Sequence, residues 1–100
     1  MDPAIPNIYA SDVVVSTAGR DQGSLYYVIS TDEMFLMLVN GKDRTLDKPK
    51  RKKLRHVQKV LRSETRVAAK LVSGDKVLNS ELRRDLAYFA REMQANNLGG

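Results

Sequence analysis

The sequence predicts a mainly β fold, in which a small five-stranded barrel or sandwich is followed by a C-terminal helical extension packed on it. Between residues 11 and 58, short runs of β-branched and aromatic residues alternate with turns that contain glycine, asparagine or proline. After residue 59 the apolar residues recur with the spacing of a helix. We therefore divide the chain into four parts: an N-terminal segment (1–10), a barrel (11–58), a helical extension (59–95) and a disordered tail (96–100).

Three strands are expected at Ser11–Thr17, Leu25–Ser30 and Met34–Val39. The stretch from Gly19 to Gly23 between the first two has the length of a connection between antiparallel strands, and its glycines supply positive φ. Asn40-Gly41 is a strong hairpin signal, which predicts a brief returning strand over Arg44–Leu46.

A fifth strand is expected over Lys50–Gln58, directly after Pro49, which suits an edge strand or a strand start. A helix is the alternative there, but the preceding proline and the β-rich context favour a strand. Because side chains alternate along a strand, Leu54 faces inward and the bases at the other parity face outward. Those outward bases are Arg51, Lys53 and Arg55.

The extension is expected to hold two helices. Ser63 can cap the first, over Glu64–Val72, and Gly74 can end it. Asn79 or Ser80 can cap the second, with Glu81 favourably placed in its first turn.

The second helix carries one apolar stripe, formed by Leu82, Leu86, Phe89 and Met93. Met34–Val39 is apolar at both parities, so that strand needs a cover on each face. We expect the barrel interior to cover one face and the C-terminal helix to cover the other.

Positive charge is concentrated in one segment. The chain has a net charge of +5, whereas residues 42–62 alone carry +8 and the remainder carries −3. A basic segment on a slightly acidic body indicates a polyanion-binding face, although a solvated charged strand remains the plain alternative.

Several classes of function are disfavoured. The chain has no cysteine and one histidine, and it shows neither a phosphate-binding P-loop nor a carboxylate pair in an evident cleft. We therefore expect no enzyme activity, no cofactor and no metal site. The longest apolar run, Met34–Val39, is too short to cross a bilayer, and the N-terminus lacks the basic start of a signal peptide. These features predict a cytoplasmic protein with no membrane partner.

The stretch from Asp12 to Ile29, DVVVSTAGRDQGSLYYVI, resembles the KOW motif. In that motif a strand is followed by a glycine, a basic residue, often an aspartate, and a second glycine before the next strand. Gly19, Arg20, Asp21 and Gly23 occupy those places, and the basic KKLRHV follows some thirty residues on. This frame is similar to small bacterial KOW-domain RNA-binding proteins and to KOW-bearing large-subunit ribosomal proteins of archaea and eukaryotes.

The resemblance implies an SH3-like barrel that binds RNA, most directly ribosomal RNA within the ribosome, with ribosomal proteins as further contacts and a monomeric chain. A transcription-associated KOW module that binds nascent transcript or polymerase is the alternative. Charge alone does not separate RNA from DNA.

The candidate site combines the loop with the basic segment. Gly19, Asp21 and Gly23 are expected to shape the loop, whereas Arg20 at its tip is expected to reach a phosphate. The RNA-binding candidates are Arg20, Lys42, Arg44, Lys48, Lys50, Arg51, Lys52, Lys53, Arg55 and His56. Lys50 and Lys52 carry less weight because they share the parity of Leu54.

The roles of three ring-bearing residues, His56, Tyr26 and Tyr27, stay open at this stage. His56 serves either packing or a phosphate hydrogen bond. Tyr26 and Tyr27 face opposite sides of a strand, so the outward one could stack on an unpaired base, with core packing as the default.

Overall fold

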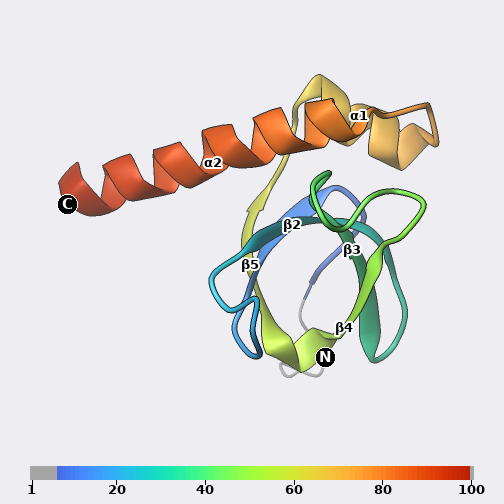
Figure 1. Ribbon diagram of the computed structural model, residues 1–100, viewed down its shortest axis with the longest axis horizontal. Coiled ribbons are helices and arrows are strands. Elements are labelled where there is room, and N and C mark those ends of the chain that lie inside the picture. Colours follow the sequence, from blue (N-terminus) through green and yellow to red (C-terminus); the bar gives the residue numbers. More distant parts are fainter. Residues whose placement is uncertain (1–6, 100) are drawn as a thin grey trace.

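The computed structural model describes residues 7–99 of the chain, and it is an α+β fold in which two helices lie over a five-stranded antiparallel sheet (Figure 1). The strands are β1 (Asp12–Ser16), β2 (Leu25–Thr31), β3 (Phe35–Val39), β4 (Lys50–Lys53) and β5 (Val57–Arg62). The helices are α1 (Arg66–Ser73) and α2 (Asn79–Gly99). The mainly β class with a packed helical extension is therefore confirmed.

The sheet is strongly curled, in the order β4-β3-β2-β1-β5 (Figure 1). Its edge strands β4 and β5 are joined by a short 3-10 turn, Leu54–His56, whose last carbonyl accepts the N–H of Thr17 at 2.9 Å. Irregular pairing at Val13/Val14 helps to bend the sheet, as β-bulges do. Within residues 7–99 no ladder pairs β4 with β5, so the sheet forms an incompletely closed barrel.

Two apolar clusters lie on opposite faces of this sheet. The inner cluster fills the barrel and consists of Ile8, Val14, Tyr26, Val28, Leu36 and Leu38. The outer cluster joins the sheet to the helices and consists of Val13, Tyr27, Val39, Val67, Ala68, Val77, Leu82, Leu86 and Phe89. The three leading residues of the expected helix stripe are thus buried against the barrel.

The cover on β3 differs in part from the expectation. Leu36 and Leu38 face the barrel interior, and Val39 reaches the helices. However, α2 packs mainly against β2. The rings of Tyr27 on β2 and Phe89 on α2 pack edge to face, with 6.4 Å between their centroids. At the far end of β3, Phe35 is only half-buried and its ring lies under the guanidinium of Arg51.

The basic region does not form one strand. The expected strand over Arg44–Leu46 is wrong, because the side chain of Asn40 accepts the N–H groups of Lys42 and Arg44 and curls the chain into an irregular loop. The expected strand over Lys50–Gln58 is wrong in extent, because the turn at Leu54–His56 divides it. That turn carries the chain from one sheet edge to the other, and β5 then extends the barrel to Arg62, past the boundary expected at residue 58.

The helix ends also differ from the sequence expectation. Thr65, not Ser63, caps α1 by accepting the N–H of Ala68 at 3.1 Å, whereas Ser63 is buried beside Tyr27. Gly74 ends α1 at φ 80°, as expected.

At the start of α2 the carboxylate of Glu81 accepts the N–H of Leu78 at 3.0 Å. The side-chain oxygen of Asn79 is buried without a hydrogen-bond partner, so the expected cap by Asn79 is not formed. The α2 backbone stays helical to Gly99, past residue 96, where a disordered tail was expected. Ala95–Leu98 contains no proline that would end the helix. No helix within residues 7–99 has both the length and the apolar character needed to cross a membrane.

Candidate functional site

The loop between β1 and β2 is a compact turn closed by its own backbone. Gly23 donates its N–H to the carbonyl of Ser16 at 2.8 Å, and Ser16 donates its own N–H to the carbonyl of Ser24 at 3.0 Å. Gly19 and Gly23 have φ of 87° and 93°, a region that favours glycine. The tip residue Arg20 is therefore held on a defined turn.

Asp21 is the centre of this turn. Its carboxylate accepts hydrogen bonds from the hydroxyls of Ser16 at 2.9 Å and Tyr26 at 2.8 Å, and from the ammonium of Lys52 at 2.9 Å. Lys50 adds an ion pair at 3.3 Å. Partial burial alone would raise the pKa of the Asp21 carboxyl, but these hydrogen bonds, that of Lys52 first, hold it well below its ordinary value.

A second loop, residues 40–49, faces the first one. Gly41 has φ of 76° and lies so close to the start of α2 that an added Cβ would clash with the carbonyl oxygen of Asn79. The guanidinium of Arg83 donates to the carbonyl of Gly41 at 2.6 Å. Helix α2 therefore fixes the position of this loop against the barrel.

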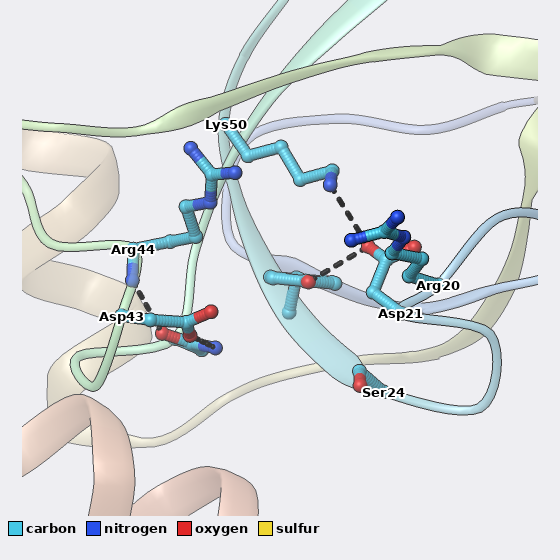
Figure 2. Close-up of a pocket in the computed structure, with 8 residues that line it drawn as sticks. Arg20, Asp21, Ser24, Asp43, Arg44 and Lys50 are labelled. Atoms are coloured by element: carbon cyan, nitrogen blue, oxygen red, sulfur yellow. Dashed lines mark hydrogen bonds and ion pairs between the residues drawn. The ribbon is translucent and has the colours of Figure 1, made fainter.

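A hollow of about 410 Å³ lies between the two loops (Figure 2), and we call it the basic hollow. It is lined by Arg20, Asp21, Ser24, Tyr26, Asn40, Asp43, Arg44 and Lys50. Figure 2 shows Arg20 and Asp21 on one side, Arg44 with Asp43 on the other, and the Lys50 side chain extending from near Arg44 toward Asp21. Three cations from three separate segments thus converge on one concave surface.

Some charged side chains in the basic hollow have ion-pair partners and others do not. Asp21 is already neutralised by Lys50 and Lys52. Among residues 7–95, neither Arg20 nor Arg44 has an ion-pair partner within 4.0 Å. Asp43 accepts from the amide of Asn40 at 2.8 Å, which is the main cause of the lowered pKa of its carboxyl. Two guanidinium groups are therefore available to an anion.

The remaining predicted residues do not join this surface. Lys52 is 8% exposed and donates to Asp21 and to the carbonyl of Ala18, so it is a structural residue of the loop. Arg51 and Lys53 lie on the opposite face of β4, whereas Arg55 and His56 lie in the turn that follows it. Lys42 and Lys48 are exposed in the loop of residues 40–49.

The two tyrosines are both core residues. Tyr26 is 2% exposed inside the barrel with its hydroxyl on Asp21, and Tyr27 is fully buried under α2. The default of core packing is confirmed, and neither ring offers a face to a base.

Sequence reasoning missed Ser24, Asn40 and Asp43 as lining residues of the hollow, and it considered Tyr26 only as a core residue or a stacking ring. The Asn40-Gly41 pair predicts a hairpin turn, and this local signal does not indicate that the loop faces the loop of residues 19–23.

No protein-family model matches this chain, and no curated protein matches it in sequence. Within residues 7–99 no cluster of three or more histidine, cysteine, aspartate or glutamate side chains could hold a metal ion. A functional proposal therefore depends on the geometry of the basic hollow and on the charge of the chain.

Proposed function

We propose that this protein is a cytoplasmic RNA-binding protein that contacts ribosomal RNA through the basic hollow. The observation that carries the proposal is the convergence of Arg20, Arg44 and Lys50 between two loops. The KOW-like sequence of the first loop supports RNA as the polyanion, and the charge of +8 over residues 42–62 supports a backbone contact.

Arg20 and Arg44 suit phosphate binding because a guanidinium presents paired N–H donors that match two phosphate oxygens. Lys50 suits it for a different reason. Its ammonium lies 3.3 Å from the Asp21 carboxylate, and that carboxylate has a closer partner in the ammonium of Lys52, at 2.9 Å. Lys50 can therefore turn toward a phosphate without leaving the Asp21 carboxylate unpaired.

The hollow also supplies neutral donors. Ser24 offers a hydroxyl at the loop end and Asn40 offers an amide, both within the lining of the hollow. Side chains of these types are among the usual donors to phosphate and sugar oxygens. The site accordingly favours recognition of a folded RNA backbone over recognition of sequence.

The first test is the salt dependence of binding. We expect Arg20→Ala combined with Arg44→Ala to weaken binding to purified ribosomal RNA and to reduce the log–log salt slope by about 2, at about one unit per lost phosphate contact. The matched control is Arg66→Ala, which removes an exposed arginine from the start of α1, where a cation is not favoured by the helix dipole. Equal slopes for the double variant and the wild type would contradict the proposal.

The second test identifies the nucleic acid. We expect the tagged protein to recover a defined region of ribosomal RNA from cell lysate in both low and high salt, and to sediment with one ribosomal subunit. Recovery of nascent transcripts with polymerase would replace the ribosomal target by the transcription-associated one. Mixed RNA and DNA that wash away with salt would overturn the specific function.

A further inference from the structure

The outer face of β4 carries a second feature that the basic hollow does not use. Side chains alternate along β4, so Lys50 and Lys52 point to the loop of residues 19–23 while Arg51 and Lys53 point the other way. On that other face Lys53 lies opposite Phe35 and Arg51 opposite Met37. The guanidinium carbon of Arg51 is 3.6 Å from the centre of the Phe35 ring.

This stacked pair forms part of a surface hollow of about 330 Å³, which we call the Phe35 hollow. Its lining residues are Asp32, Glu33, Met34, Phe35 and Arg51. Met34 is 64% exposed and Phe35 is half-buried, although both are large apolar side chains. An apolar and aromatic surface next to an arginine plane is the kind of surface on which a base can stack.

The turn before β3 holds the Phe35 hollow in shape. A single carboxylate oxygen of Asp32 accepts the N–H of Met34 at 2.9 Å and that of Phe35 at 2.8 Å. Within residues 7–95 the carboxylate of Glu33 has neither a hydrogen-bond nor an ion-pair partner. Asp32 is thus committed to the turn, whereas Glu33 offers an unused acceptor at the rim.

We propose that the Phe35 hollow binds one unpaired guanine base of the bound RNA, which stacks on the Arg51–Phe35 pair and donates its N1–H and N2–H groups to the Glu33 carboxylate. The inference rests on the proposed RNA binding and adds base recognition to it. Phosphates remain on the basic hollow, which is reached from the opposite face of β4.

Guanine is the base that this chemistry selects. A carboxylate is an acceptor only, and it matches two adjacent N–H donors. Guanine alone presents two such donors side by side on its pairing edge. Adenine and cytosine each place a ring acceptor beside their amine, and uracil flanks its single N–H with carbonyls, so each of them brings an acceptor toward Glu33. The negative charges of Asp32 and Glu33 also disfavour a phosphate in this hollow.

The experiment measures binding of labelled uridine dodecamers that carry a single central guanosine, adenosine or inosine. We expect the guanosine oligonucleotide to bind about tenfold more tightly than the adenosine one, because both purines can stack but only guanine can donate two N–H groups to Glu33. Tenfold corresponds to about 1.4 kcal/mol. Inosine keeps N1–H but lacks the N2 amine, so its affinity should fall between the two. Equal affinity for all three would overturn the inference.

Two variants separate this site from phosphate binding. Phe35→Leu keeps an apolar side chain but removes the ring, and it should lose most of the guanosine preference while binding all-uridine RNA as the wild type does. Glu33→Gln should lose the preference for guanosine over adenosine and yet bind all-uridine RNA slightly more tightly, because it removes a negative charge. A preference that survives either variant would overturn the inference.

The two proposals fail in distinguishable ways. If the all-uridine dodecamer binds and its affinity depends on Arg20 and Arg44, while no base preference is found, only the guanine site is wrong. If none of these oligonucleotides binds at low salt but purified ribosomal RNA does, only the guanine site is wrong. If neither the oligonucleotides nor purified ribosomal RNA bind, both proposals are wrong.

Discussion

At Asp21 one short side chain organises much of the candidate site. Its carboxylate ties the loop of residues 19–23 to β2 through Tyr26 and to β4 through Lys52 and Lys50. Lys52 is 8% exposed, so its ammonium depends on Asp21 and the carbonyl of Ala18 for partners. Asp21 pairs with the buried ammonium of Lys52, so the loop needs no RNA to take this shape and to hold Arg20 in place.

We expect Asp21→Asn to destabilise the fold by about 1–3 kcal/mol at neutral pH, the usual cost of leaving a buried donor without its partner. The folded pKa of this carboxyl lies below its ordinary value of 3.8, so its contribution is complete at neutral pH and is lost as the pH falls below 3.8. Urea unfolding of both proteins at several pH values measures this. A difference between variant and wild type that does not shrink in acid would contradict the role of Asp21.

At the scale of single elements, β4 uses both of its faces, and α2 both covers the sheet and holds a loop. The alternation of β4 points Lys50 and Lys52 to the loop of residues 19–23 and Arg51 and Lys53 to the other face, where Arg51 lines the Phe35 hollow. Helix α2 buries Leu82, Leu86 and Phe89 against the sheet, and its first turn holds Gly41 in the facing loop. The helix thus supports the site without lining it.

Leu86→Ala should destabilise the protein by about 2–5 kcal/mol, because it removes a buried side chain between α2 and β2. The matched control is Val72→Ala on α1, which is exposed and should change stability by less than about 0.5 kcal/mol. Denaturant unfolding followed by circular dichroism measures both. Similar, small effects for the two variants would mean that α2 is not docked on the barrel.

For the whole molecule, one buried polar joint connects the sheet to both helices. The hydroxyl of Tyr27 on β2 lies 2.7 Å from the carboxylate of Asp85 on α2 and 2.8 Å from the hydroxyl of Ser63. Thr65, the cap of α1, donates to the same Asp85 oxygen at 2.7 Å. The barrel and the two helices therefore share one hydrogen-bonded centre within the outer apolar cluster.

Tyr27→Phe should lower stability at neutral pH by about 1–2 kcal/mol, because Asp85 loses a buried donor. Burial, together with the charge of Asp85, raises the pKa of Tyr27 from 10.0 to about 12. The contribution of Tyr27 is complete below pH 10 and falls as the pH rises toward 12. The stability difference between wild type and variant should therefore shrink between those pH values in urea titrations. A constant difference across that range would contradict the assignment.

Local chemistry made several features of this protein predictable. The two loop glycines take positive φ, Gly74 ends α1, and the helix stripe through Leu82, Leu86 and Phe89 is buried. The inward direction of Lys52 followed from its parity with Leu54. These features depend on backbone propensity and on periodicity, which neighbouring residues largely set.

Other features depended on contacts between distant segments, which no local pattern contains. The basic run turns at Leu54–His56, where the chain passes from one edge strand of the curled sheet to the other. Asn40 shapes its loop by accepting the N–H groups of Lys42 and Arg44.

The sequence by itself determined a small β barrel with docked helices and a basic segment, because composition and periodicity carry that information. Only the tertiary structure decided which cations are free. Whether a lysine or an arginine faces an acid, a ring or an open hollow depends on the strands and loops that the fold brings beside it.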